Sequence, residues 1–374
     1  MAVTVPRAEV VGSLLRPPEL VGAMSAVYSK GHTALLEEER ARDLERLHRL
    51  EDELVAEVVP RQIEIGLDVV SDGEFRRAAY SNSFYDAVEG LEPNPEPMRF
   101  YSRDGSYVEY GAPPVAARRL KKVASPAAAE ASYLAALTDH LFKVALPAAS
   151  RWCLPYTHRR DGPYRDLEEL ATDAVEIEKE LLADVVAAGC RYVQLDFPAY
   201  PMFVDERWTA PLREQGADLE SLLELALKVD REVAESVPDG VRAALHLCRG
   251  NHRSRWLFQG SLEPLAERLF QLPYDSFLVE WEDVDREGGY EPIRFLPRGK
   301  TLVMGLVSSK TARLETDDEI LRRLDEASAF LDVDQLAIST QCGFASTWHG
   351  NEIDADTMWR KLELVARVAD RVWA

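Results

Sequence analysis

Val241-Arg-Ala-Ala-Leu-His-Leu-Cys-Arg-Gly-Asn251 is an apolar run that ends in a histidine and a cysteine. A strand points every second side chain to the same face, so His246 and Cys248 can reach one metal ion together. Glu280 and Cys342 end two further apolar runs in the same manner. One imidazole, two thiolates and one carboxylate form a four-ligand set that suits zinc. The pattern of short apolar runs closed by polar side chains also decides the fold.

Eight such runs alternate with longer amphipathic segments, and we expect the runs to be strands. They cover residues 9–12, 68–71, 143–147, 191–195, 242–245, 276–279, 301–305 and 335–338. Helical patterns cover residues 33–59, 167–187, 219–235, 262–269, 317–330 and 356–372. Strands that are buried on both faces and separated by helices indicate a parallel sheet. Eight units, with no Gly-x-Gly-x-x-Gly after the first run, predict a closed α/β barrel of the (β/α)8 type, a TIM barrel.

No linker or low-complexity tract divides the chain, so we expect one catalytic barrel domain over residues 1–374. An insertion at about residues 82–124 interrupts the rhythm after the second strand. It begins with several prolines and continues with alternating polar and apolar residues at 99–103 and 106–110. These features predict a loop that carries a β-hairpin.

Composition narrows the classes of partner. The chain has 374 residues, of which 46% are hydrophobic and 29% charged, and a formal charge of −21. Such a charge disfavours nucleic acid and anionic membranes, so we expect a small-molecule substrate. The N-terminus has no signal-peptide pattern and no apolar stretch approaches a membrane span, which predicts a cytoplasmic protein. Four scattered cysteines indicate reduced thiols rather than a disulfide framework.

The candidate site residues all fall just after a predicted strand, where barrel enzymes build their active sites. In chain order these residues are Ser13, Glu74, Asp196, His246, Cys248, Glu280 and Cys342. The position of these residues after strands and the suitability of four of them as metal ligands are independent observations. Both point to an active site at the same end of the barrel.

The charge of the proposed zinc site favours thiol chemistry over hydrolysis. Two thiolates and one carboxylate around a divalent ion leave a net charge of about −1. A thiolate-rich shell is a weaker Lewis acid toward water, but it can still deprotonate an incoming thiol and leave its sulfur electron-rich. Such a site suits alkylation of a thiol.

Each of these residues also has an ordinary explanation when it is taken alone. His246 and Cys248 could be a satisfied polar pair in the core, Glu280 half of an ion pair and Cys342 a small apolar side chain. A structural zinc site would favour close cysteine pairs in loops rather than ligands spread over nearly a hundred residues. The combination therefore favours a catalytic metal site.

Six motifs carry a resemblance to a known family. They are Val11-Gly-Ser-Leu-Leu-Arg-Pro17, Asp72-Gly-Glu-Phe-Arg-Arg77, Gln194-Leu-Asp-Phe-Pro-Ala199, His246-Leu-Cys248, Val279-Glu280 and Gln341-Cys-Gly343. In this order they resemble the catalytic domain of cobalamin-independent methionine synthase, from about residue 8 to the C-terminus. The resemblance implies a zinc-dependent barrel that transfers an alkyl group to a thiol.

Residue roles follow from the resemblance. It makes His246, Cys248, Glu280 and Cys342 ligands of Zn²⁺, and it makes Ser13, Glu74 and Asp196 the groups that hold the amino acid part of homocysteine. Two carboxylates can bind an ammonium while a serine meets the substrate carboxylate. Lys310 stands where the family has a histidine that donates a proton, so we assign it a catalytic role.

The leading hypothesis is a zinc-dependent S-methyltransferase of methionine biosynthesis, with homocysteine as methyl acceptor. The methyl donor would be a folate or a methyl-corrinoid on a carrier protein. The resemblance covers only the catalytic domain, so we expect no counterpart of the second, N-terminal barrel that the long form carries. The folate-contacting acid of the family corresponds here to Met202. One alternative is alkyl transfer to another thiol, as in epoxyalkane–coenzyme M transferases. A metal-free barrel like the uroporphyrinogen decarboxylases and a non-catalytic zinc-binding protein are further alternatives.

Overall fold

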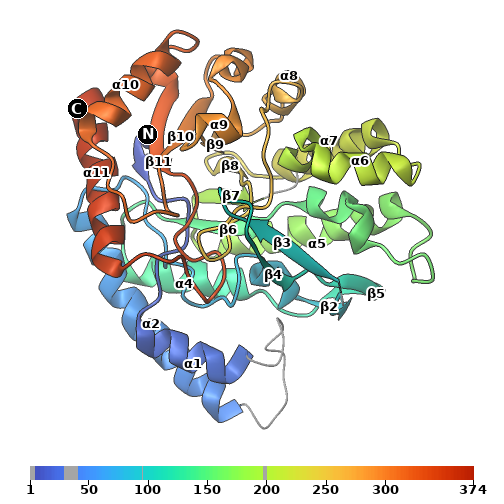
Figure 1. Ribbon diagram of the computed structural model, residues 1–374. Helices are drawn as coiled ribbons and strands as arrows, with labels where there is room; N and C mark the ends of the chain where they lie inside the picture. The colour runs from blue at the N-terminus through green and yellow to red at the C-terminus, as the bar shows by residue number, and fades with distance from the viewer. Residues whose placement is uncertain (1–4, 29–40, 95, 197–199) are drawn as a thin grey trace.

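The strands form one curled sheet whose two edges meet. The computed structural model describes residues 5–28, 41–94, 96–196 and 200–374. Seven parallel strands lie in the order β1-β11-β10-β9-β8-β7-β6. Their bounds are β1 (Ala8–Glu9), β6 (Lys143–Pro147), β7 (Tyr192–Asp196), β8 (Arg242–Leu247), β9 (Ser276–Glu280), β10 (Thr301–Val307) and β11 (Leu336–Thr340). Val69 and Val70 close the gap, because they form parallel bridges to Glu9 beside β11 and to Phe142 beside β6. The predicted (β/α)8 barrel is confirmed (Figure 1).

One apolar cluster fills the inside of the barrel. It consists of Val11, Val69, Tyr192, Ala244, Leu278, Val303 and Ala337, with Leu141 packed against it. Side chains alternate between the two faces of a strand, so residues two or four positions further along share the inward face. His246 follows Ala244 by two positions, and Glu280 follows Leu278 by two. The strand pattern that fills the barrel therefore also points these polar side chains into it.

A buried ion pair lies at the start of two strands. Lys143 Nζ contacts Glu9 Oε2 at 2.5 Å, and both side chains are 1% exposed. Tyr192 donates its hydroxyl to the same carboxylate at 3.1 Å. Because Lys143 and Tyr192 are the first residues of β6 and β7, this cluster lies at the opposite end of those strands from the candidate site.

Helices cover the outside of the barrel. Their bounds are α1 (Pro18–Tyr28), α2 (Ala41–Glu64), α4 (Pro126–Leu137), α5 (Leu167–Ala187), α6 (Glu206–Glu214), α7 (Leu219–Glu235), α8 (Ala266–Leu269), α9 (Val284–Glu287), α10 (Asp317–Ser328) and α11 (Ala355–Trp373). Six of them begin at a side chain that accepts a backbone N–H of the first turn, which fixes the helix start. These caps are Asp166 for α5, Asp205 for α6, Asp218 for α7, Asp283 for α9, Thr316 for α10 and Asp354 for α11.

Most of the expected helices are found. The predictions for 167–187 and 219–235 are confirmed with their bounds as α5 and α7, and those for 317–330 and 356–372 correspond to α10 and α11. The described part of the expected helix 33–59 is α2, which ends five residues later, while residues 33–40 lie outside the described residues. The helix at 262–269 is wrong in extent, because α8 begins only at Ala266. Pro264 disfavours a helical conformation for Glu263 before it, so the helix does not extend back to Leu262.

The insertion after the second strand contains the predicted hairpin. Strand β3 (Pro97–Tyr101) pairs antiparallel with β4 (Tyr107–Gly111), and β2 (Val88–Glu92) pairs antiparallel with β5 (Val115–Lys122). The short helix α3 (Asn82–Tyr85) precedes them. Tyr101 exchanges backbone hydrogen bonds of 2.6 and 3.0 Å with Trp256, in the loop after β8. The hairpin is therefore attached to the same side of the barrel as the candidate metal ligands.

Candidate metal centre

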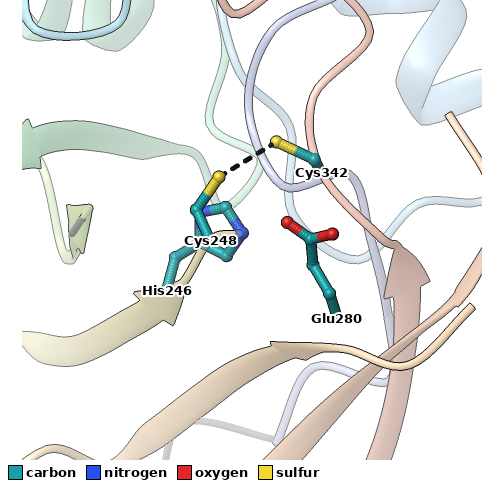
Figure 2. A group of neighbouring side chains, drawn as sticks. All are labelled: His246, Cys248, Glu280 and Cys342. Atoms are coloured by element: carbon teal, nitrogen blue, oxygen red, sulfur yellow. Dashed lines mark hydrogen bonds between the residues drawn. The ribbon is translucent and has the colours of Figure 1, made fainter. Parts of the chain in front are cut away.

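Four potential metal ligands meet where β8, β9 and β11 end (Figure 2). His246 is part of β8, Cys248 follows it directly, Glu280 ends β9, and Cys342 lies two residues after β11. One ligand atom from each residue lies within 4.8 Å of all the others. The two cysteine sulfurs are 3.6 Å apart although 94 residues separate them in the sequence. The four residues that the sequence proposed as one set are thus brought together by the barrel.

His246 is oriented as a metal ligand would be. Its Nδ1 is 3.0 Å from Asp196 Oδ1, so this nitrogen carries a proton that it donates to the carboxylate. The other nitrogen, Nε2, is buried and has no hydrogen-bond partner among the described residues. A buried polar atom without a partner is costly, and a carboxylate behind the imidazole of a metal ligand is a recurrent arrangement. The free nitrogen therefore fits a bound cation.

The sulfur atoms of Cys248 and Cys342 form a hydrogen bond of 3.6 Å with each other. Their mutual hydrogen bond lowers the pKa of Cys342 to about 7 and raises the pKa of Cys248 well above its usual value. Gly250 also donates its backbone N–H to Cys248 Sγ at 3.3 Å. A divalent cation would take the place of the proton between the two sulfurs, because thiolates are the metal-binding form of cysteine.

Glu280 is held in its charged form. Burial by itself would raise its pKa, but the charges of Lys310 and Arg286 outweigh burial and the pKa is lowered. Its Oε2 accepts the side-chain amide of Gln341 at 2.9 Å and lies 3.4 Å from Lys310 Nζ. The positive charge of Lys310 compensates the excess negative charge that two thiolates and a carboxylate would leave on a divalent ion. The chemistry and charge of the donor set therefore fit zinc.

The three expected substrate residues line a cavity together with three of the ligands. Ser13, Glu74 and Asp196 lie in its wall with His246, Cys248 and Cys342. The empty space amounts to about 960 Å³, part of which is open to solvent. Residues of the inserted hairpin complete an apolar part of the wall. They are Met98, Phe100, Tyr110 and Gly111, with Ala112, Pro113 and Pro114 next to them. The cavity thus combines a polar, metal-binding end with an aromatic wall.

Glu74 adopts a strained backbone conformation in this cavity. Its φ of 54° lies in the left-handed region, which non-glycine residues rarely adopt outside functional sites. Burial raises the pKa of Glu74 to about 8, and the nearby Asp196 adds to the effect while Arg77 and Arg16 oppose it. Its Oε2 has no hydrogen-bond partner among the described residues. A cationic substrate group would satisfy this oxygen and restore the charged form.

Two glycines make room for the substrate residues. A Cβ at Gly12 would lie 2.2 Å from Glu74 Oε1, and a Cβ at Gly343 would lie 2.0 Å from Ser13 Oγ. Ser13 Oγ accepts the backbone N–H of Ala345 at 3.1 Å, which leaves its own proton available to a substrate oxygen. The glycines of the first and last motifs therefore serve the packing of the site.

The sequence did not reveal every contact or every residue of the site. Asp196 was predicted as a substrate-binding residue, but its hydrogen bond to His246 was not predicted. Asn251 lines the cavity, donates to the carbonyl of Gly343 at 2.8 Å and leaves its buried Oδ1 without a partner among the described residues. Arg151 also lines the cavity. Its position in a short 3₁₀ turn after β6 gave no periodic signal. Lys310 is not among the described residues of the cavity wall, since it lies against Glu280.

The fold and the ligand cluster define a (β/α)8 barrel with a candidate metal centre at the carboxyl ends of its strands. The sequence model of the family described as cobalamin-independent synthase, catalytic domain, matches residues 31–359. The chain therefore belongs to the cobalamin-independent methionine synthase family, as the six motifs indicated, and membership in this family supports a methyltransferase. Among the described residues, we find no helix with the length and apolar character that crossing a membrane requires.

Three similar proteins illustrate the relationship. The uncharacterized protein YxjH of Bacillus subtilis (strain 168) is 33% identical over 377 residues, which cover 98% of this chain and 94% of that protein. The 5-methyltetrahydropteroyltriglutamate–homocysteine methyltransferase of Flavobacterium johnsoniae is 24% identical over 78% of this chain, which spans only 34% of that longer enzyme. The solved structure of a B12-independent methionine synthase from Shewanella sp. W3-18-1 has a TM-score of 0.70 at 21% identity, with 98% of this chain and 97% of that chain covered. At this identity the structural likeness supports the fold alone.

Proposed function

We propose that the chain is a zinc-dependent methyltransferase that transfers a methyl group to the thiol of homocysteine and so forms methionine. The observation that carries the proposal is the convergence of four ligand atoms within 4.8 Å of one another beside a cavity that also contains Ser13, Glu74 and Asp196. Such a cavity offers a place for a sulfur, an ammonium and a carboxylate at once. The match to the family supports the same reaction class.

His246, Cys248, Glu280 and Cys342 would hold the zinc ion. When bound, the ion would lower the pKa of a thiol that reaches it, while the thiolate-rich donor set keeps the sulfur electron-rich enough to attack a methyl carbon. Asp196 fixes the proton of His246 on Nδ1 and so directs the lone pair of Nε2 toward the ligand cluster. Arg249 donates its backbone N–H to Glu280 Oε1 at 2.8 Å and restrains that carboxylate.

The amino acid part of homocysteine would bind to the other side of the cavity. Glu74 and Asp196 provide carboxylate oxygens for the ammonium, and Ser13 provides a hydroxyl for the carboxylate. The tight packing of Gly12 against Glu74 restricts where the carboxylate can move. These residues would hold the sulfur close to the ligand cluster and so raise its effective concentration.

We assign Lys310 the role of proton donor to the departing group. Its ammonium is buried beside Glu280, at 3.4 Å from Oε2, and therefore lies next to the ligand cluster. Lys310→Gln should lower kcat, whereas zinc content should stay at one ion per chain. An unchanged kcat in this variant would exclude the lysine as proton donor.

The methyl donor would be a methylated folate, or a methyl-corrinoid carried by a partner protein. The longer relative from Flavobacterium johnsoniae is named for a folate donor, but this chain spans only 34% of it. All four cysteines are free, which is compatible with the reducing cytoplasm that we propose as the location.

The test combines metal analysis with thiol-dependent turnover. We expect one zinc ion per chain and transfer of a labelled methyl group to homocysteine. Cys248→Ala and Cys342→Ala should each lose zinc and activity, whereas Cys190→Ala is a matched control because Cys190 is a buried cysteine whose Sγ bonds the carbonyl of Tyr192. Protein without zinc, together with full activity in both ligand variants, would refute the mechanism. Preference for coenzyme M over homocysteine would change the acceptor to a sulfonate thiol.

A further inference from the structure

Arg151 is a buried cation without an acidic partner. It is 7% exposed, and the contacts of its guanidinium are to phenol groups: Nε donates to the hydroxyl of Tyr85 at 2.7 Å, and Nη1 donates to the hydroxyl of Tyr80. No carboxylate among the described residues lies within ion-pair distance of it, and Nη2 has no hydrogen-bond partner there. A buried arginine needs hydrogen bonds for all of its N–H groups and normally a counter-charge.

Two other buried arginines of this region show what a structural role looks like. Arg77 makes a bidentate pair with Glu130, at 2.8 Å from Nε to Oε1. Arg16 donates to four backbone carbonyls, among them those of Ala345 at 2.8 Å and Glu74 at 2.7 Å. Arg77 has its counter-charge and Arg16 has carbonyl partners on both terminal nitrogens. Arg151 differs from both because it keeps donor capacity and charge that no protein group uses.

Arg151 belongs to the wall of the cavity. Arg151 lines it together with Tyr80, Tyr85 and Tyr156, and it is the only arginine or lysine among the described residues of the wall. Asp196 and, once it has released its proton, Glu74 provide negative charge in the same wall. The main positive charges acting on Glu74 come from Arg77 and Arg16 rather than from Arg151.

The backbone that carries Arg151 is firmly anchored. Arg151 belongs to the 3₁₀ turn Ala149–Cys153 that follows β6. Ser150 donates its backbone N–H and its hydroxyl to Asp230 of α7, at 3.0 and 2.6 Å. On the other side, Trp152 packs against Phe84 and Tyr85 with ring centroids 5.4 and 6.3 Å apart. A cation that is fixed before the ligand arrives loses little freedom on binding, which is the usual property of a built recognition site.

We propose that Arg151, oriented by the hydroxyls of Tyr80 and Tyr85, is an anion subsite that takes a carboxylate of a substrate in this cavity. The planar guanidinium matches a carboxylate in a forked geometry. A net charge of −21 repels anionic substrates at long range, so a local cation is needed to bind one. The inference rests on the proposed function, because the carboxylate would belong either to the thiol acceptor or to the methyl donor.

The experiment measures binding by titration calorimetry with zinc-loaded protein and four probes. Homocysteine carries both charged groups, 3-aminopropane-1-thiol lacks the carboxylate, 4-sulfanylbutanoate lacks the ammonium, and a methylated folate represents the donor. The variants are Arg151→Gln and Arg151→Lys. Arg242→Gln is the matched control, since Arg242 is a partly buried arginine at the first position of β8 that bonds Ser276 and Thr301.

Loss of a charge-assisted, forked contact should weaken binding roughly 10- to 100-fold. If the thiol acceptor supplies the carboxylate, Arg151→Gln weakens the binding of homocysteine and of 4-sulfanylbutanoate by this factor, and the affinity for 3-aminopropane-1-thiol stays unchanged. If the methyl donor supplies the carboxylate, only the binding of the folate is weakened. Arg151→Lys should recover part of the loss, and Arg242→Gln should match the wild type with every probe.

The subsite and the proposed function can fail separately. Zinc content and methyl transfer test the proposed function. The effect of Arg151→Gln on the affinity for carboxylate probes tests the subsite. Unchanged affinity for all carboxylate probes in Arg151→Gln overturns the subsite even when the enzyme turns over, and so does a wild type that binds none of them. If Arg151→Gln does not fold, Tyr85→Phe removes one of the two orienting hydroxyls. It should weaken the same probes roughly 2- to 10-fold, and no effect would overturn the subsite.

Discussion

Replacement of Asp196 should show how much the carboxylate behind His246 contributes to zinc affinity. Asp196 Oδ1 accepts two hydrogen bonds, from His246 Nδ1 at 3.0 Å and from Gln194 Nε2 at 2.9 Å. In Asp196→Asn the amide oxygen will occupy the place of Oδ1, because the amide NH₂ group there would oppose two donors. The geometry of His246 is then kept and only the negative charge is lost. In Asp196→Ala the hydrogen bond is lost as well.

The expected magnitudes follow from this difference. Removing the partner behind a ligating histidine typically costs 10- to 100-fold in metal affinity. We expect a loss near the lower limit for Asp196→Asn, about 1.4 kcal/mol, and near the upper limit for Asp196→Ala, about 2.8 kcal/mol. Zinc affinity is measured by competition with a chromogenic chelator at fixed pH. Glu74→Gln is the matched control, because Glu74 lies in the same cavity wall but forms no hydrogen bond to His246. It should weaken homocysteine binding and leave zinc affinity unchanged.

Two outcomes would refute this reasoning. If Asp196→Ala binds zinc as tightly as the wild type, the carboxylate does not orient His246. If the asparagine and alanine variants lose the same affinity, the two hydrogen bonds do not hold the amide oxygen in place and the charge alone matters.

Three further predictions concern other parts of the barrel. Gly12→Ala should weaken homocysteine binding roughly 10-fold without loss of zinc. The reason is that the new Cβ would lie 2.2 Å from Glu74 Oε1 and displace that carboxylate. An unaltered affinity for homocysteine in calorimetry would contradict the packing argument. Because the pKa of Glu74 is about 8, it holds its proton near neutral pH and must release it to bind an ammonium. Homocysteine binding should therefore tighten as the pH rises toward 8. Calorimetry in buffers of different ionisation enthalpy should show that binding releases about one proton more from the wild type than from Glu74→Gln. Equal proton release from the two proteins would exclude this role of Glu74. Lys143→Met should lower the free energy of unfolding by about 3–5 kcal/mol because it leaves Glu9 buried without its partner, and Glu9→Leu in the same chain should restore most of it in urea denaturation. A Lys143→Met variant as stable as the wild type would contradict the argument from the buried ion pair.

The barrel could be predicted because its strands are buried on both faces. Such strands appear as short apolar runs of four or five residues, and their ends in the structure lie within a few residues of the runs. The second strand is the weakest element, with bridges at Val69 and Val70 only, yet its run Asp68–Ser71 was apparent because both valines are fully buried.

Helices with a clear apolar stripe were also predictable, and those without one were not. Helix α4 consists mainly of alanine with few large side chains, so apolar and small residues surround it and no periodicity marks its buried face. Helix α6 contains Pro211, which normally argues against a helix, and it buries only Thr209. Sequence periodicity shows which positions of a helix are buried. In these two helices the buried and the exposed positions differ little in residue type.

The candidate metal ligands could be predicted because each lies at or just after the end of a buried strand. Asn251 and Arg151 lie in loops or short turns instead, where neither periodicity nor spacing predicts which way a side chain points. The role of Asp196 toward His246 could not be predicted for a different reason. It depends on the lateral register of β7 against β8, which places Asp196 directly beside His246. A list of strands does not contain that register.

The spacing of the ligands links the metal to the closure of the barrel. His246 and Cys248 are neighbours on one strand, but Cys342 is 94 residues from Cys248 and reaches it only when β8, β9, β10 and β11 lie side by side. In the unfolded chain these ligands do not form a common site, so zinc that binds all four binds the folded state alone. Binding to the folded state alone adds its free energy to the stability of the fold. The same closure packs Gly343 against Ser13, and thus joins the first strand segment to the last on the side of the substrate. The pairing of β1 with β11 therefore completes the amino acid end of the cavity, next to the candidate ligands that β8, β9, β10 and β11 bring together.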